Sequence, residues 1–227
     1  KMLFSSFGPL ALKWNYVPKM LNWFLHYLKS CNKKSMLHTA KYMNQILSLS
    51  NDAYEEIFQE IDISGLVEKK GIIYIWTNKN LKSRNLEIKV RKELGIDQKL
   101  LSQKEVLDLE PNLQPVFDAG VIYESAMHAR DPHGILKKIF KLYLERGGKF
   151  IQTNIKKLEQ ININETAIRS ENEEYKFEKT VVASGAFSKT LTDQLGENIP
   201  LDTERGYHVH FKGKDHLISR PVIFLDR

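Results

Sequence analysis

The sequence lacks the short motifs that mark self-contained nucleotide-binding or hydrolytic domains. It contains no GxGxxG, no GxxxxGK[ST], no GxSxG and no HExxH pattern. None of its 12 glycines forms a phosphate-cradling loop at the start of an expected helix. These absences argue against a self-contained nucleotide-binding domain and against a hydrolase.

Cysteine and long apolar runs are also scarce. The single cysteine, Cys31, excludes an internal disulfide framework and favours a reducing compartment. No stretch approaches the ~18 to 20 apolar residues of a membrane-spanning helix, and the opening KMLFSSFGPL is not a signal-peptide pattern. We therefore expect a cytoplasmic protein, with peripheral association with the inner membrane left open by the helix described below.

Composition indicates a folded domain without a nucleic-acid partner. Of the 227 residues, 42% are hydrophobic and 27% charged, which is ordinary for a globular protein. The net charge of +6 comes from lysines spread along the chain and interleaved with glutamates, as in 171–179. A nucleic-acid surface would instead show a clustered basic stripe with aromatic residues. The charge is therefore interpreted as a solvated surface.

Two amphipathic stretches open the chain. Pro18 is placed for the first turn of a helix in which Leu21, Phe24 and Leu28 recur at helical spacing. This helix is apolar over most of its surface, and Trp23 widens its apolar face. It is expected either to pack on a partner domain or, with its lysines, to contact a membrane surface. A second helix is expected over residues 37–61.

The remaining pattern mixes strands and helices. Ser102 and Glu105 form a capping box, and Asp131 with Pro132 begins another helix. Strands are expected at 71–76, 120–125, 149–161, 166–170, 174–184, 204–213 and 220–225. Because many of these strands follow one another directly, the fold class is predicted as α+β with a mixed, largely antiparallel sheet.

The densest polar cluster contains His128, Arg130, Asp131 and His133. A metal site here would need further convergent ligands, and Asp131 is already explained as a helix cap. No metal site is therefore predicted. His128 and Arg130 lie between a strand and a helix, so they remain candidate ligand contacts.

A small-residue crossover occurs in KTVVASGAFSKTL. An apolar strand over 180–183 runs into Ser184 and Gly185 and then directly into a helix. Small residues at such a crossover let a ligand approach the backbone closely.

The order of these segments resembles a known family. The DPHG helix start, the ERGG helix end, KFIQTNIKKLE, VVASGAFS and PLDTERGYHV follow one another as in the FAD-dependent D-amino-acid oxidase and dehydrogenase superfamily. The segments GPLALKWNYVPKMLNWFLHYL and LLSQKEVLDLEPNL resemble its bacterial D-amino-acid dehydrogenase small-subunit branch. The resemblance covers nearly the whole chain and depends on order and spacing.

The resemblance implies FAD as cofactor and an amino acid as substrate. The implied FAD contacts are Ile155, Ala183, Ser184, Gly185 and Phe187. The implied substrate-cavity residues are Tyr74, Arg205, Tyr207 and His208. For Tyr207 and His208, simple alternation along an edge strand is an equally good interpretation. Catalytic residues stay unassigned.

The implied activity is oxidative deamination of amino acids, D-amino acids above all, by hydride transfer from the α-carbon to the flavin. In this branch the electrons pass to a membrane quinone. The alternatives are a sarcosine- or glycine-type amine oxidase, and a non-catalytic binding or scaffold domain that keeps the fold.

The same resemblance predicts the domain organisation. Residues 1–147 are expected to form mainly the substrate-side domain, 148–200 part of the FAD-binding domain, and 201–227 a return into the substrate-side sheet. The family's GxGxxG unit and its C-terminal segment are absent from the sequence. We therefore expect an internal piece of the enzyme that by itself binds FAD poorly and is inactive.

Overall fold

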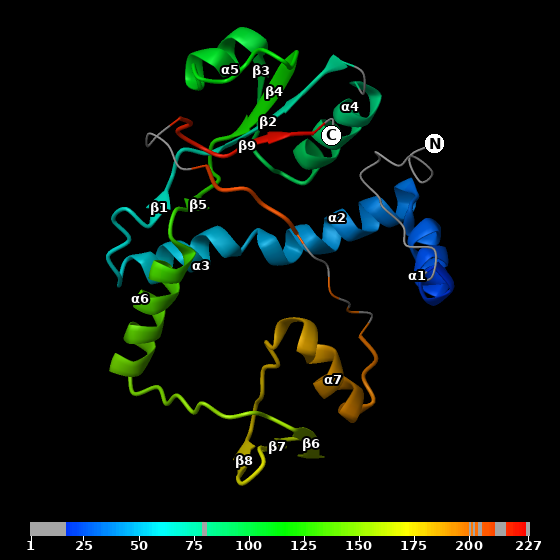
Figure 1. Cartoon of the computed structure of the whole chain (residues 1–227), viewed down its shortest axis with the longest axis vertical. Helices are drawn as coiled ribbons and strands as arrows, with labels where there is room; N and C mark the ends of the chain where they lie inside the picture. Colours follow the sequence, from blue (N-terminus) through cyan, green and yellow to red (C-terminus); the bar gives the residue numbers. More distant parts are fainter. Residues whose placement is uncertain are drawn as a thin grey trace. The chain divides into compact units, whose positions relative to one another are not determined.

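The computed structural model describes residues 17–78, 81–199, 201, 203, 206–211 and 217–225, without the side chains of 17, 19, 20, 22 and 81–83. The chain divides into two compact units, Lys1–Leu142 with His216–Arg227, and Tyr143–Asp215. Figure 1 labels their helices and strands.

Three helices open the first unit: α1 (Val17–Ser30), α2 (Lys33–Leu47) and α3 (Ser50–Phe58). The Asn32 side chain caps α2 by accepting a hydrogen bond of 2.9 Å from the Ser35 N–H. The single helix expected over 37–61 is therefore wrong, since it begins earlier and is broken between α2 and α3. The Ser50 hydroxyl donates to the Leu47 carbonyl at this break, where a serine competes with the backbone for helical hydrogen bonds.

A four-stranded sheet forms the centre of the first unit. Its strands are β2 (Ile72–Trp76), β3 (Lys99–Ser102), β4 (Ala119–Tyr123) and β9 (Val222–Phe224), in the order β3-β4-β2-β9. β4 is antiparallel to β2 and β3, whereas β9 is parallel to β2. Two helices flank this sheet, α4 (Leu81–Glu93) and α5 (Gln103–Leu109) (Figure 1).

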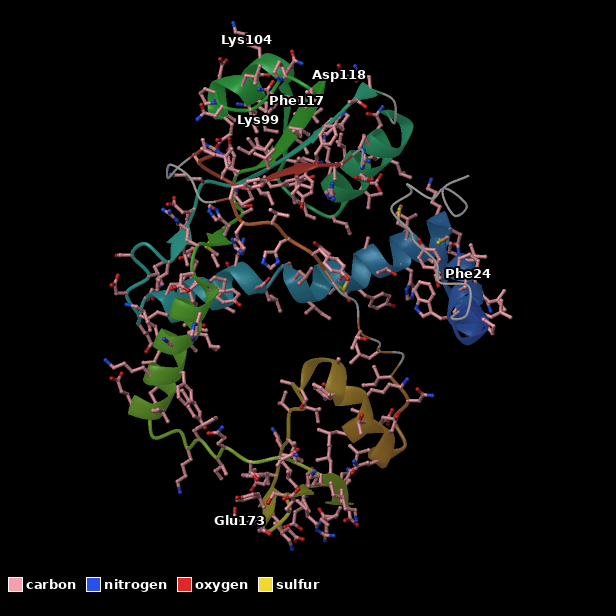
Figure 2. All side chains as sticks on the ribbon, in the orientation of Figure 1. Phe24, Lys99, Lys104, Phe117, Asp118 and Glu173 are labelled. Atoms are coloured by element: carbon pink, nitrogen blue, oxygen red, sulfur yellow. The ribbon has the colours of Figure 1, made fainter. Side chains whose placement is uncertain are left out.

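Strand alternation gives the sheet two hydrophobic faces. Ile73 pairs with Ile122, and both pack with Val106 of α5 and with Phe117. On the opposite face, Trp76, Val121 and Tyr123 pack with Ile88 of α4 and with neighbouring apolar side chains. Because both faces are covered, β2 and β4 are apolar along nearly their whole length. Figure 2 shows Phe117 beside α5 and Lys104 extending away from it.

Local sequence signals position α5 against this sheet. The predicted capping box is confirmed, since Ser102 and Glu105 exchange side-chain and backbone hydrogen bonds at its start. Gly120 of β4 lies under the helix, where an added Cβ atom would lie 3.0 Å from Val106 Cγ2 and 3.0 Å from the Tyr74 carbonyl oxygen. A larger residue there would force α5 away from the sheet.

A second strand pair leads to the long helix α6 (Pro132–Glu145). β1 (Val67–Glu68) pairs antiparallel with β5 (His128–Ala129), with Glu68 opposite His128. The predicted helix start is confirmed, because the Asp131 carboxylate accepts a hydrogen bond of 2.9 Å from the Gly134 N–H.

The second unit is a three-stranded antiparallel sheet with a short helical segment. Its elements are β6 (Lys157–Asn162), β7 (Glu165–Arg169), β8 (Glu174–Phe177), the 3₁₀ turns η4 (Gly185–Phe187) and η5 (Asp193–Leu195), and α7 (Ser188–Thr192). Gln194 of η5 connects this segment to β6: its Oε1 accepts from the Leu158 N–H at 3.0 Å, and its Nε2 donates to the Lys156 carbonyl at 3.1 Å. The predicted α+β class with mixed, mostly antiparallel sheets is confirmed.

Three predicted strands of this unit are shorter than expected or absent. The strand expected over 149–161 begins only at Lys157, and residues 180–183 and 206–211 are not in strands. A strand requires a neighbour to pair its backbone groups. Within the part of the chain that the structure describes, none pairs with these segments, so an apolar pattern alone does not make them strands.

Candidate functional site

The turn predicted to contact FAD is an exposed stretch of backbone. The Ser184 N–H donates to the Ser188 hydroxyl at 3.1 Å, and the Phe187 N–H donates to the Ser184 carbonyl at 3.1 Å. Gly185 has a φ of +57°, which favours glycine, and the space beside its Cα is open. Phe187 is 78% exposed. The turn can therefore receive a flat ligand against its backbone.

Ile155, the other predicted FAD contact, lies just before β6. It is half-buried, and the Lys156 N–H donates to the Arg169 carbonyl at 2.9 Å. The helix α7, which follows the 183–187 turn directly, packs on β6. Ile155 precedes β6 and the 183–187 turn precedes α7, so each predicted FAD segment adjoins one of two elements that contact each other.

Tyr74, a predicted substrate-cavity residue, belongs to an aromatic and cationic cluster of the first unit. Its ring meets the ring of Tyr123 edge-on, with 5.4 Å between centroids. The Arg91 guanidinium of α4 lies 5.7 Å from the Tyr74 ring and 5.4 Å from the Tyr123 ring, within cation–π range. It also donates to the Tyr123 hydroxyl at 2.9 Å. Burial raises the pKa of Tyr123, and Arg91 opposes this increase.

Sequence reasoning missed Arg91. It lies in α4 one helical turn after Glu87, and their side chains are 3.8 Å apart, so it resembles an ordinary surface ion pair. Its position over two tyrosine rings depends on how α4 packs on the sheet, and no spacing in the sequence indicates that.

The remaining substrate-cavity predictions belong to the second unit. Tyr207 is 87% exposed and lies outside the strands, and the rings of His208 and His210 meet edge-on at 4.6 Å. Arg205 lies outside the described residues. Tyr74 is in the other unit. That these four residues line one cavity therefore stays a prediction.

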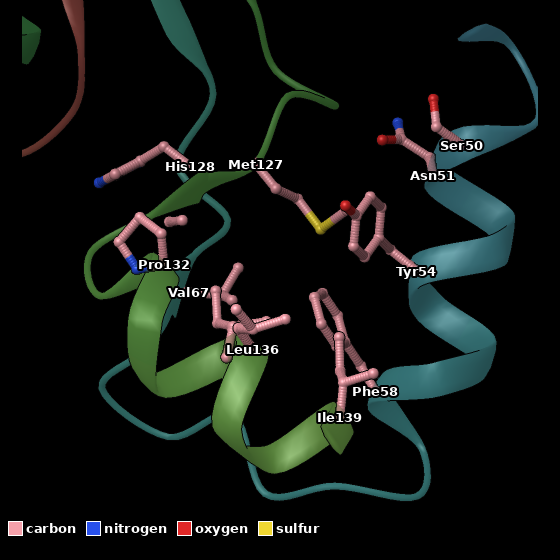
Figure 3. Close-up of a pocket in the computed structure, with 12 residues that line it drawn as sticks. Ser50, Asn51, Tyr54, Phe58, Val67, Met127, His128, Pro132, Leu136 and Ile139 are labelled. Carbon is pink, nitrogen blue, oxygen red and sulfur yellow. The ribbon is translucent and has the colours of Figure 1, made fainter. Parts of the chain in front are cut away.

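The first unit contains an apolar pocket of about 490 Å³ between α3, α6 and the β1–β5 pair (Figure 3). Tyr54 and Phe58 of α3 face Leu136 and Ile139 of α6 across it, and Met127 closes one side. Such a lining suits an apolar or aromatic group. No residue pattern in the sequence pointed to this pocket.

The polar cluster around α6 does not assemble as a metal site. Asp131 caps the helix, and Arg130 lies 3.2 Å from the Glu68 carboxylate. In the described part of the chain, no group of three or more histidine, cysteine, aspartate or glutamate residues is arranged to hold a metal ion.

Comparison with solved structures defines the class of fold. Glycine oxidase from Geobacillus kaustophilus superposes with a TM-score of 0.52 at 17% sequence identity, over 74% of this chain and 44% of that one. This similarity shows a shared fold.

The family follows from sequence. The model of the DAO family, described as FAD dependent oxidoreductase, matches residues 18–226. The chain is 31% identical to a D-amino-acid oxidase of Bradyrhizobium diazoefficiens over 91% of this chain and 49% of that protein. It is 24% identical to a D-amino acid dehydrogenase of Neisseria meningitidis over 91% of this chain and 50% of that protein. The chain belongs to the DAO family of FAD-dependent oxidoreductases, and it spans about half the length of these curated relatives.

Proposed function

We propose that the protein carrying this sequence oxidises amino acids, D-amino acids above all, by hydride transfer from the α-carbon to FAD. The main support for this proposal is the family match over residues 18–226, together with 31% identity to a protein named D-amino-acid oxidase. Bound FAD supplies the two-electron acceptor. Loss of the hydride and of an amine proton leaves an imino acid, which water converts to the oxo acid and ammonia.

In this proposal the second unit supplies the FAD contacts. Ile155, Ala183, Ser184, Gly185 and Phe187 are assigned to the cofactor. The residues fit that role, because the turn exposes backbone and apolar surface and carries no bulky side chain before Phe187. Tyr74, Arg205, Tyr207 and His208 are assigned to the substrate cavity.

Turnover by the protein carrying this sequence, saturated with FAD, tests the activity. We expect reduction of an artificial dye acceptor with D-amino acids and at least tenfold slower reduction with their L-enantiomers. Glycine and sarcosine serve as competing substrates in the same panel. Equal rates for both enantiomers, or faster turnover of sarcosine than of any D-amino acid, would contradict the proposal.

A matched pair of variants tests the FAD contact. In the protein carrying this sequence, Phe187→Ala should weaken FAD binding about tenfold, or about 1.4 kcal/mol. Quenching of flavin fluorescence measures the affinity. Phe177→Ala removes another exposed phenylalanine of the same unit, from β8, and should leave the affinity unchanged. Equal effects of the two substitutions would contradict the assignment.

We also assign α1 to contact with a membrane surface, where a quinone could accept the electrons. Leu21, Trp23 and Leu25 are each more than half exposed, Trp23 stacks on Tyr27, and Lys29 lies in the last turn. Among the described residues, no helix is long and apolar enough to cross a bilayer.

Sedimentation with anionic and with neutral phospholipid vesicles tests this contact. Trp23→Ala with Lys29→Glu should abolish binding to the anionic vesicles. Phe177→Ala with Lys176→Glu also removes one aromatic ring and reverses one lysine charge, on β8, and should leave binding intact. Binding that survives in the α1 double variant would refute the contact.

A further inference from the structure

The first unit contains another hollow, of about 400 Å³, whose lining includes three cationic side chains. It lies between the β1–β5 pair and the segment that leads into β9, and Glu68, Lys70, His128, Arg130, Ser219 and Arg220 line it. We propose that this hollow binds a small oxyanion, a carboxylate or a phosphate. The inference goes beyond the proposed function, because it involves neither FAD nor the residues assigned to the substrate.

Positive charge exceeds negative charge around the hollow. Lys70 Nζ and Arg130 Nη1 each lie 3.2 Å from a different oxygen of Glu68. Hydrogen bonding to Lys70 lowers the pKa of Glu68, with Arg130 adding to the effect against partial burial, so this carboxylate is ionised at neutral pH. The Glu68 carboxylate contacts one nitrogen of each cation. An ammonium group has three N–H donors and a guanidinium group has five, so Glu68 does not use all of them. Further donors can therefore reach an anion.

A third cation is fixed in position before any ligand binds. Arg220 Nε donates to Glu110 Oε1 at 3.0 Å, and Arg220 Nη1 donates to the Lys70 carbonyl at 2.9 Å. Glu110 is only 2% exposed and also accepts the Ser219 N–H at 2.8 Å. A guanidinium held on two sides loses little conformational entropy when an anion binds.

His128 provides a spectroscopic probe inside the hollow. Its Nδ1 is buried and has no hydrogen-bond partner in the described structure. The residue lies opposite Glu68 in the β1–β5 pair and lines the hollow, so its ring signals respond to an anion that binds beside it. Figure 3 shows the His128 side chain directed away from Met127 and Leu136 at the edge of the apolar pocket, and His128 lines both cavities.

NMR spectra of the histidine ring signals, recorded on the full 227-residue chain, test the site. Inorganic phosphate and, separately, acetate are titrated at constant ionic strength, and the ring signals of His128 are assigned with His128→Asn. We expect a saturable shift of the His128 signals with at least one of the two anions. A phosphate-only response identifies phosphate groups as the ligand class, and an acetate response identifies carboxylates.

Two variants with the same loss of charge supply the control. Arg130→Gln should raise the dissociation constant about tenfold, whereas Lys104→Gln, which removes an exposed lysine from α5, should change it less than twofold. Lys70→Gln provides a second site variant should Arg130→Gln fail to fold. A shift that does not saturate with either anion, or equal weakening by the Lys104 and site variants, would overturn the proposal.

Discussion

The two sheets of this protein are stabilised in different ways. Of the thirteen buried hydrophobic residues among those described, eleven belong to the first unit and two, Leu158 and Ala167, to the second. The four-stranded sheet is covered on both faces by α4 and α5. The three-stranded sheet instead carries exposed ion pairs, such as Arg169 with Glu174 and Lys157 with Glu159.

This difference is already present in the strand sequences. β2 reads IIYIW and β4 reads AGVIY, which suits strands buried on both faces. β6 reads KLEQIN and β8 reads EYKF, in which charged or polar residues separate the larger apolar ones. Exposed ion pairs contribute little, with a median of about 0–1 kcal/mol. We therefore expect the first unit to dominate the free energy of unfolding.

The largest effect is expected at Phe117, which is 1% exposed between α5 and the sheet. Phe117→Ala should lower the free energy of unfolding by about 3–5 kcal/mol, because it removes buried surface and leaves a cavity. Urea denaturation followed by tryptophan fluorescence measures this. The neighbouring Val116 is 66% exposed, and Val116→Ala should change stability by less than about 0.5 kcal/mol. Similar losses in both variants would mean that this core does not dominate.

A smaller and local effect is expected at Leu158, 3% exposed in β6. Leu158→Ala should cost about 2 kcal/mol, at the low end for leucine truncation, because so little is buried around it. Hydrogen exchange should show lost protection in β6 and β7 while β2 and β4 keep theirs. Ile163→Ala, at an exposed position in the turn between β6 and β7, is the control. Equal loss of protection in β2 would show that the two sheets unfold together.

Local signals in the sequence predicted much of the fold. The Ser102–Glu105 capping box and the Asp131 cap are confirmed because each depends on residues only three apart. Long-range pairing was less accessible. The strand expected over 180–183 is apolar, yet no described strand pairs with it, and the short edge strand β3 was not predicted.

The candidate sites divide in the same way. The 183–187 turn could be recognised because small residues there follow one another in sequence. The cluster of Arg91 with Tyr74 and Tyr123, and the contact of Glu110 with Arg220, join residues from distant segments. Such contacts depend on helix packing and on strand order, which no local pattern encodes.

A third effect concerns the cap of α5 in the first unit. Ser102 caps α5 with a complete capping box, whereas α7 begins without a side-chain cap. Ser102→Ala should lower the free energy of unfolding by about 1 kcal/mol, and Ser102→Asp, which keeps an acceptor oxygen, should restore most of it. Chemical denaturation of the three proteins measures both changes. Equal losses for Ala and Asp would mean that α5 does not depend on its cap.

The smallest effect is expected at low pH and again in the first unit. The hydroxyl and backbone N–H of Ser64, and then Lys138 of α6, lower the pKa of Asp62 from 3.8 to about 2. Because the folded-state pKa lies below the unfolded one, this carboxylate stabilises the fold above about pH 4. Its contribution is lost as the pH falls towards 2. The stability difference between wild type and Asp62→Asn, measured by urea denaturation from pH 5 to 2, should therefore shrink over that range. The stability difference between wild type and Lys138→Gln should be smaller and should shrink over the same pH range, because that variant keeps the Ser64 hydrogen bonds to Asp62. A difference that stays constant down to pH 2 would show that Asp62 does not couple protonation to folding.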